Sequence, residues 1–359
     1  MMRKKGGKHS GLLLIIMMAL TLATCVDRIP FEAEDKEPKL VIFGTFTQLS
    51  QDHEVSIHMT EKFGSLGIPV QGAGVELIDE EGNTAKYIEF QEGQYILPEG
   101  AMCGELGKAY KLTVTLQNER RYESTWEKMP ETIQIEKPTF EVNKRPIVSS
   151  VNVLVDHFFI DILIDIPLRT LSGDNAFLRW EVEETYSVID LQCTALDGSQ
   201  ICYLNVNNNF DKLNIFTSID DSQKRLEKYR VYSRLVVPYQ EFSEWHYFNV
   251  FQYAISVSTY EYWSKIDIVS NPTGSIFDKT AAAVTGNITE IGGSSEVLGF
   301  FEVAAITFGR VRTTRQELME WIQFPKICNR FIPPQYQPDF CCNCKILPNN
   351  IPRPDYWGE

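Results

Sequence analysis

The sequence predicts a mainly β protein with two β-rich domains and a short cysteine-rich tail. Three observations lead to this prediction. Apolar and polar residues alternate with a period of two along most of the chain, which is typical of half-buried strands. Turn-forming clusters interrupt these runs at short intervals. The chain has 359 residues, of which 43% are hydrophobic, so it exceeds what one hydrophobic core usually serves.

The first domain is expected over residues 39–135. It contains short apolar or alternating runs, and turn signals such as Asp79-Glu80-Glu81-Gly82-Asn83 separate them. The expected strands are 40–46, 54–59, 74–78, 87–90, 93–97, 110–116 and 122–126. Strands this short at this regular spacing predict a β-sandwich.

The second domain is expected over residues 136–325, with a few short helices among its strands. Val151, Val153 and Val155 alternate, and the alternation restarts out of register at Phe158, which predicts a β-bulge at Asp156-His157. Further strands are expected at 176–188, 229–237, 246–258, 282–289 and 297–312. Helices are expected at 258–266, with Ser258 as the N-cap, and at 315–323.

The N-terminal segment has the features of a bacterial export signal. Basic residues precede an uncharged apolar run from Leu12 to Leu22, which is too short to span a bilayer. The run ends in Leu22-Ala23-Thr24-Cys25. This resembles a lipobox, the motif in which the cysteine thiol receives a diacylglycerol and the chain is cut before the cysteine. We predict a lipoprotein signal peptide over residues 1–24, lipidation at Cys25, and a lipidated tether over 25–38.

Charge excludes some classes of partner. Removing residues 1–24 takes away four basic and no acidic residues, which changes the formal net charge from −14 to −18. So acidic a chain is not expected to bind nucleic acid or to dock electrostatically on anionic lipid. Membrane attachment would therefore depend on the acyl chains at Cys25, and two or more of these hold a protein durably.

Seven cysteines remain after Cys25, and export to an oxidising compartment favours disulfides. Cys193 and Cys202 flank the turn signal Asp197-Gly198, so we predict that they pair across a hairpin. Cys328 is expected to pair with one of Cys341, Cys342 or Cys344 and to staple the tail, residues 326–359. Cys103 is left over, and we expect a free buried thiol. The spacings C-C and C-x-C do not suit zinc, so we predict no metal and no cofactor.

The sequence contains no recognisable catalytic motif, and we expect no enzyme activity. There is no nucleophile elbow, P-loop, dinucleotide fingerprint or paired histidine motif. The acidic pairs Glu183-Glu184 and Asp220-Asp221 leave a glycoside hydrolase as an alternative, because that chemistry needs two carboxyl groups across a sugar. Trp245, Tyr260 and Trp263 form the densest aromatic group, which is either core or a ligand-stacking surface.

Several stretches resemble a Bacteroidota outer-membrane lipoprotein family of unknown function, usually encoded beside TonB-dependent transporters of the starch-utilisation type. The matching stretches are Leu40 to Gly44, Gly72 to Val75, Gly107 to Leu112, Tyr260 to Trp263, Gly286 to Ile288, Leu298 to Phe301, Cys341 to Cys344 and Pro354 to Trp357. The resemblance implies an N-terminal immunoglobulin-like sandwich, like the regulatory domain of carboxypeptidases, and then a family-specific β-rich domain. It carries over no catalytic residues.

Together these observations lead to one functional hypothesis and two alternatives. We expect a surface-exposed outer-membrane lipoprotein that acts as a non-catalytic accessory or cargo-binding partner of a TonB-dependent transporter, with a glycan or peptide as its cargo. The alternatives are a hydrolase acting on glycans or peptides outside the inner membrane, and a structural or adhesive surface lipoprotein.

Overall fold

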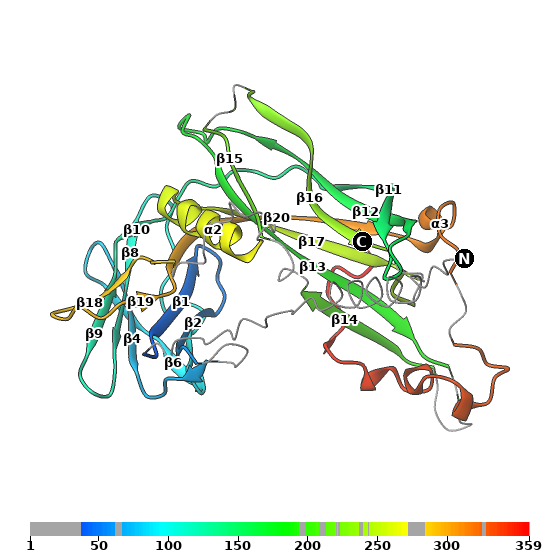
Figure 1. Cartoon of the computed structure of the whole chain (residues 1–359), viewed down its shortest axis with the longest axis horizontal. Coiled ribbons are helices and arrows are strands. Elements are labelled where there is room, and N and C mark those ends of the chain that lie inside the picture. The colour runs from blue at the N-terminus through cyan, green and yellow to red at the C-terminus, as the bar shows by residue number, and fades with distance from the viewer. Residues whose placement is uncertain are drawn as a thin grey trace, which may run out of the picture. The chain divides into compact units, whose positions relative to one another are not determined.

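Strands make up most of the chain in the computed structural model, which confirms the predicted mainly β fold (Figure 1). The structure describes residues 37–61, 67–191, 193, 199–207, 213–219, 221, 223–236, 240–242, 244–271, 284–324 and 328–358. The expected signal peptide, Cys25 and nearly all of the expected tether therefore lie outside the described residues. The strands form three open sheets.

The largest sheet has twelve strands and includes residues from both ends of the described chain. Its main path is β21 (Asn350–Ile351), β14 (Ile201–Asn207), β13 (Phe177–Ile189), β17 (His246–Ala254), β20 (Phe301–Thr313), β1 (Leu40–Thr47), β2 (His53–Met59), β7 (Gln94–Leu97) and β6 (Ile88–Gln91). Three short strands join it from the side: β15 (Asn214–Thr217) at β13, β19 (Val297–Leu298) at β1 and β3 (Ile68–Pro69) at β2. Strands β19 and β20 run parallel to β1, whereas the other neighbours are antiparallel.

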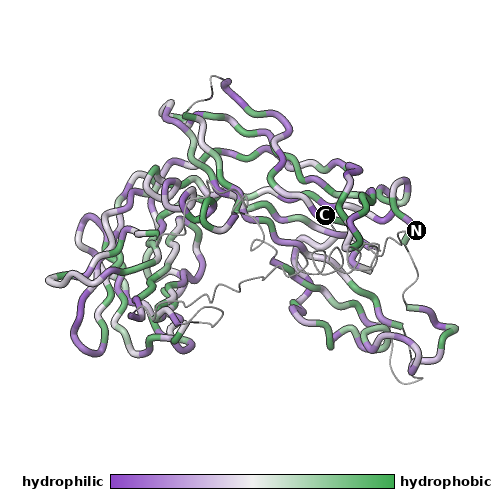
Figure 2. Tube along the Cα trace, viewed as in Figure 1, coloured by the Kyte–Doolittle hydropathy of each residue, from purple (hydrophilic) through white to green (hydrophobic). Residues whose placement is uncertain are grey.

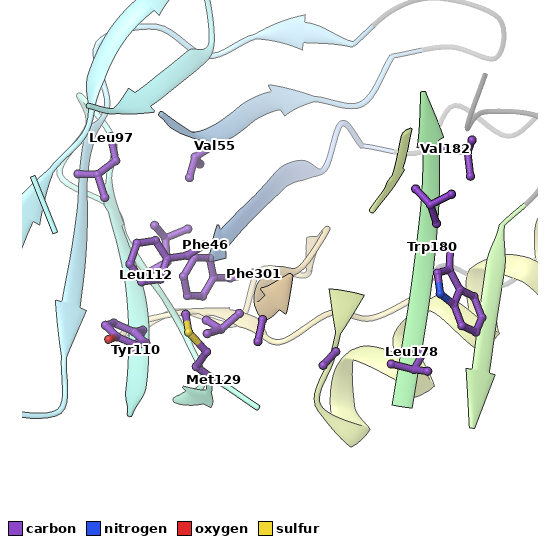
Figure 3. Packing of buried hydrophobic residues seen from close by; sticks show 14 of the residues in the cluster. Phe46, Val55, Leu97, Tyr110, Leu112, Met129, Leu178, Trp180, Val182 and Phe301 are labelled. Atoms are coloured by element: carbon purple, nitrogen blue, oxygen red, sulfur yellow. The ribbon is translucent and has the colours of Figure 1, made fainter. Parts of the chain in front are cut away.

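A second sheet faces the β1–β2–β7 part of the first and forms the predicted sandwich with it. It contains β18 (Ile288–Glu290), β9 (Arg121–Ser124), β8 (Ala109–Thr115), β4 (Gly74–Asp79) and β5 (Thr84–Lys86), with β10 (Glu127–Lys128) beside β8. Buried residues alternate with more exposed ones along β1, β4 and β8. Figure 2 shows hydrophilic and hydrophobic residues interspersed along the chain. Phe46 and Tyr110, from opposite sheets, have ring centroids 4.8 Å apart in this core (Figure 3).

The third sheet consists of β11 (Thr139–Val148), β12 (Leu154–Pro167) and β16 (Arg225–Leu235). The predicted bulge at Asp156-His157 is wrong, because β11 pairs with β12 there without a register shift. The irregularities lie further along, between Ile162 and Leu163 and between Ile164 and Ile166, where β12 faces β16. The alternating run that suggested the bulge also begins outside β12. Val151 lies in the turn that the hydrogen bond from the Ser149 N–H to the Val153 carbonyl closes, at 2.8 Å.

Helices are few in the residues that the structure describes, as expected. They are α2 (Val257–Ser270), α3 (Arg315–Leu318) and the 3₁₀ turns η1 (Gln240–Phe242), η2 (Pro334–Tyr336), η3 (Asp339–Cys341) and η4 (Cys344–Ile346). The predicted cap of α2 is wrong by two residues: the Ser256 hydroxyl, not Ser258, accepts the Thr259 N–H at 3.1 Å. α2 is the longest helix in the described part of the chain and has 14 residues; none there is long and apolar enough to cross a bilayer.

A pair of glycines allows the segment before β20 to lie close beside β1. Gly299 has a φ of +93°, and a Cβ atom added to it would lie 2.0 Å from the Ile42 carbonyl oxygen. A Cβ atom added to Gly286 would lie 1.5 Å from the Gly299 carbonyl oxygen. Only glycine fits at such backbone contacts. Between them in sequence, the buried Asn287 side chain donates to the Phe301 carbonyl at 2.9 Å and accepts the Phe301 N–H at 2.8 Å. The start of β20 is therefore fixed against β18.

The six candidate cysteines all form disulfides, but the predicted pair Cys193–Cys202 is wrong. The bonds are Cys193–Cys342, Cys202–Cys344 and Cys328–Cys341, so Cys328 pairs within the tail as expected, whereas Cys193 and Cys202 do not pair with each other. Cys103 has a free thiol, which is exposed and not buried as expected. Figure 1 shows the tail, at the red end of the colour scale, beside β14.

The course of the chain after β13 explains the wrong pair. The β13–β14 ladder continues only as far as the hydrogen bond from Asp190 N–H to Gln200 carbonyl, at 3.0 Å. The next N–H, that of Leu191, donates to the Cys341 carbonyl at 2.7 Å. Cys193 therefore follows the tail and not the hairpin. The turn Asp197-Gly198 lies outside the described residues.

The buried carboxylate of Glu184 connects the third sheet to the largest one. Glu184 of β13 is 1% exposed and contacts His246 of β17, with 2.8 Å between Oε2 and Nε2. The Tyr232 hydroxyl of β16 donates to Oε1 of Glu184 at 2.5 Å, and Arg234 Nε lies 3.5 Å from Oε2. Burial alone would raise the pKa of Glu184. The hydrogen bond and charge of His246, with Arg234 and Tyr232, outweigh burial and hold this pKa at about 2.

We predict that removing the Cys202–Cys344 bond by replacing both cysteines with alanine lowers the free energy of unfolding by about 3 kcal/mol or more. Its cysteines lie only 9 (202 − 193) and 2 (344 − 342) residues beyond those of the Cys193–Cys342 bond. In the intact protein it therefore closes only a short additional loop, and short loops contribute about this amount. Urea unfolding measures the change. Replacing Cys103 with alanine is the control and should leave stability within about 0.5 kcal/mol. An equal loss in both proteins would contradict the prediction.

We also predict that Glu184 makes folding sensitive to acid. Its pKa is lowered from the ordinary value of 4.5 to about 2 in the folded protein, so the stabilisation is fully present above pH 4.5 and is lost as pH falls towards 2. The expected loss is about 3 kcal/mol. Urea unfolding of the wild type and of Glu184→Gln, between pH 6 and pH 2.5, tests this. The variant should lose less stability over that interval, and parallel curves for the two proteins would exclude this role for Glu184.

Candidate functional site

Two of the predicted stacking residues, Tyr260 and Trp263, lie on α2 and face the body of the protein. The Trp263 ring packs 5.6 Å from Phe43, and its Nε1 donates to the buried Glu302 carboxylate at 2.6 Å. Tyr260 lies 5.6 Å from Phe177. These contacts are those of a packed helix face.

The third predicted stacking residue, Trp245, is not near the other two. It precedes β17, whereas α2 follows the far end of that strand, about 27 Å away at the usual strand rise. Trp245 instead packs with Trp357 of the tail, with centroids 6.2 Å apart, and Arg312 lies over its ring at 4.6 Å. The structure therefore does not bring the three residues together.

The adjacent acids Glu183 and Glu184 point to opposite faces of β13, as strand geometry requires. Glu184 is buried against His246, whereas Glu183 lines a surface pocket. The two carboxylates therefore cannot act together across one sugar. For the other acidic pair, Asp221 accepts the Gln223 N–H at 2.8 Å, and Asp220 lies outside the described residues.

The surface pocket has a volume of about 480 Å³ and lies where the tail crosses one face of the largest sheet. We call it the tail pocket. Strands β13, β14, β17 and β20 supply one part of its lining, and the tail supplies the rest. Its residues are Glu183, Asn205, Asn249, Phe251, Phe308, Arg310, Ile351, Pro352, Arg353, Pro354, Asp355 and Tyr356.

Strand register places the sheet residues of the tail pocket in two rows. Glu183 pairs with Asn249, and Asn249 pairs with Arg310, so three polar side chains from three strands lie side by side. Two residues along, Phe251 of β17 pairs with Phe308 of β20, and their ring centroids are 5.3 Å apart. A polar row thus borders an aromatic one.

Internal contacts hold the charged groups around the tail pocket. Arg310 Nε donates to the Asn249 side-chain oxygen at 2.6 Å, and its guanidinium stacks 3.3 Å from the centre of the Tyr356 ring. Arg353 donates to the Trp357 carbonyl at 3.0 Å. Glu183 accepts a hydrogen bond from the Asn205 amide at 3.3 Å. These contacts order the side chains before any ligand arrives.

An aromatic cluster fixes the tail that forms the pocket wall. Trp357 lies 4.9 Å from Tyr203 and 4.9 Å from Tyr247, in addition to Trp245. The Tyr356 hydroxyl donates to the Thr185 hydroxyl at 3.0 Å. Together with the two disulfides upstream, these contacts determine where the tail lies on the sheet.

A second surface feature is the loop over residues 328–341, which the Cys328–Cys341 disulfide closes. We call it the aromatic loop. Phe331 is 88% exposed and Tyr336 76% exposed. The Gln337 side chain holds the loop from inside: its oxygen accepts the Asn329 N–H at 2.8 Å and its nitrogen donates to the Ile332 carbonyl at 2.6 Å. The exposed rings are thus carried by an ordered backbone.

The described residues include no group of three or more His, Cys, Asp or Glu side chains that could hold a metal ion. The tail pocket contains two carboxylates, two arginines and two amides, beside aromatic rings. Such a site can bind a ligand by hydrogen bonds and stacking.

Neither the tail pocket nor the aromatic loop was predicted from the sequence. One signal for the pocket is present in the strands. Residues two apart in a strand point to the same face of the sheet, and polar or aromatic residues occur at this spacing in three strands. The pairs are Glu183 and Thr185, Asn249 and Phe251, and Phe308 and Arg310. The register that aligns these pairs across strands is set by tertiary structure. For the loop, the signal is Phe331 and Tyr336 between two cysteines that pair.

No curated protein matches the chain. A family described as a domain of unknown function, DUF4249, matches residues 26–310. The match includes the sandwich, the third sheet and most of β20, and leaves out the tail. Because it spans most of the chain, this protein belongs to the DUF4249 family.

Proposed function

We propose that this protein is a surface-exposed outer-membrane lipoprotein that acts as a non-catalytic, cargo-binding partner of a TonB-dependent transporter. The motif Leu22-Ala23-Thr24-Cys25 supports the membrane address. Three disulfides, two of which join the tail to the body, support an oxidising compartment. The transporter as partner follows from the family resemblance.

The observation that carries the partnership is the aromatic loop. Exposing Phe331 and Tyr336 to water has no benefit for folding, and rigid exposed aromatics are the usual anchors of protein interfaces. The disulfide and the Gln337 hydrogen bonds reduce the conformational entropy lost on binding.

Charge indicates what the aromatic loop contacts. Its charged residues, Arg330 and Asp339, balance each other, although the mature chain carries a formal charge of −18. A neutral loop with exposed rings suits an apolar pocket of a protein. It has no excess of basic residues to attract anionic lipid. We therefore assign the aromatic loop as the docking surface for the transporter.

The membrane address is tested by replacing Cys25 with serine in the full chain. The variant lacks the thiol that receives the lipid, so it should move from the membrane fraction to the soluble fraction or remain as an uncleaved precursor. Replacing Cys103 with serine is the matched control and should leave the protein in the outer membrane. Mass spectrometry of the wild-type N-terminus should find acylated Cys25. An unmodified Cys25 in the mature protein would contradict the proposed address.

The partnership is tested by purifying the tagged lipoprotein from membranes in mild detergent. We expect mass spectrometry to identify a TonB-dependent transporter in the eluate, and the double variant Phe331→Ala, Tyr336→Ala to recover at least about tenfold less of it. Leu171→Ala is the matched control, because Leu171 is 97% exposed in the turn between β12 and β13 and is not part of the loop. Recovery of the wild-type lipoprotein alone would argue against the partnership, and equal recovery with the double variant would reject the loop as the docking surface.

A further inference from the structure

We infer that the tail pocket binds a short, uncharged oligosaccharide. This inference rests on the proposed cargo-binding function and assigns both the site and the ligand class. The volume of about 480 Å³ falls in the range of small-molecule sites.

The charges of the tail pocket favour an uncharged ligand. Arg310 and Arg353 are balanced by Glu183 and Asp355. Both arginines already donate to protein oxygens, and Glu183 already accepts from Asn205. An anion or cation entering the pocket would meet groups of both signs and gain little net attraction.

The aromatic row supplies an apolar surface that a sugar ring can cover. Phe308 is 45% exposed although it lies in the middle of β20, and Phe251 packs beside it. A pyranose ring carries C–H groups on one face, and stacking that face on a phenyl ring removes apolar surface of both from water.

The polar row supplies groups that match vicinal hydroxyls. The Glu183 carboxylate offers two acceptor atoms, the Asn205 amide nitrogen is a donor, and the Arg310 guanidinium carries several donors. These planar groups are already oriented by their neighbours, so a hydroxylated ring can bind several of them at little entropic cost. The combination of one apolar face and one hydroxylated edge is the chemistry of a saccharide.

A peptide fits the same pocket less well. Extended peptides usually bind by adding a strand to an open sheet edge, where their backbone finds free partners. At the nearest edge, β21 already pairs with β14 through Tyr203 and Leu204. On the sheet face the backbone groups are used within the ladder, so only side chains remain to recognise a ligand.

The test uses the full-length purified lipoprotein in detergent and an array of short neutral glucans, mannans and galactans, with charged oligosaccharides and tetrapeptides on the same array. We expect binding to one or more neutral glycans. Titration calorimetry with the strongest of these should show that Phe308→Ala weakens binding about tenfold, which corresponds to about 1.4 kcal/mol. Glu183→Gln should also weaken it, because one acceptor is replaced by a donor.

Phe90→Ala is the matched control. Phe90 lies on β6, has the same exposed fraction as Phe308, 45%, and does not line the tail pocket. It should leave the affinity unchanged. Binding only to peptides or charged sugars, binding that survives both pocket variants, or no binding on the array would each overturn the inference.

These outcomes separate the ligand from the proposed function. The titration requires neither a membrane nor a transporter, and the co-purification requires no cargo. If the lipoprotein binds no glycan but still co-purifies with the transporter, only the ligand assignment is wrong. If the lipoprotein binds a glycan but never co-purifies with a transporter, only the transporter partnership is wrong.

Discussion

The parallel pairing of β1 with β20 is the constraint on which the rest of the structure depends. Register aligns Gly44 with Phe301 and Thr47 with Ala304, and the Gly44 N–H donates to the Phe300 carbonyl at 3.1 Å. This contact joins strands more than 250 residues apart into one sheet. Such long-range pairing costs loop-closure entropy, so close packing must repay it. The glycines at 286 and 299 and the buried Asn287 make that packing possible.

Once β20 is fixed beside β1, its other edge determines where both candidate surfaces lie. β20 pairs with β17, and β17 with β13, so Arg310, Asn249 and Glu183 align in one row. β14 extends the sheet to the edge at which the tail attaches. The disulfides from Cys193 and Cys202 then hold the tail over that row, and the same anchoring places the aromatic loop. One continuous sheet thus relates the proposed cargo site to the proposed docking surface.

Much of the local structure was predictable because it depends on neighbours in sequence. The alternation in β1, β4 and β8 predicted strands, and the polar cluster after Ile78 predicted their turn. Errors arose where a local pattern had two readings. Val151 continued an alternating run but lies in a turn, and Ser258 resembled a cap although Ser256 makes the hydrogen bond. In both cases a hydrogen bond to a particular backbone group decided between the readings.

The sequence alone determined the class of fold, the cysteines that are candidates for disulfides and the absence of a recognisable catalytic motif, because composition, period and motif are local properties. Only the tertiary structure decided which cysteines pair, that Trp245 joins the tail and not α2, and that Glu183 and Glu184 serve different surfaces. The physical reason is that sheet pairing brings together residues that are distant in the chain. Their partners follow from strand order and register, which no short stretch of sequence contains.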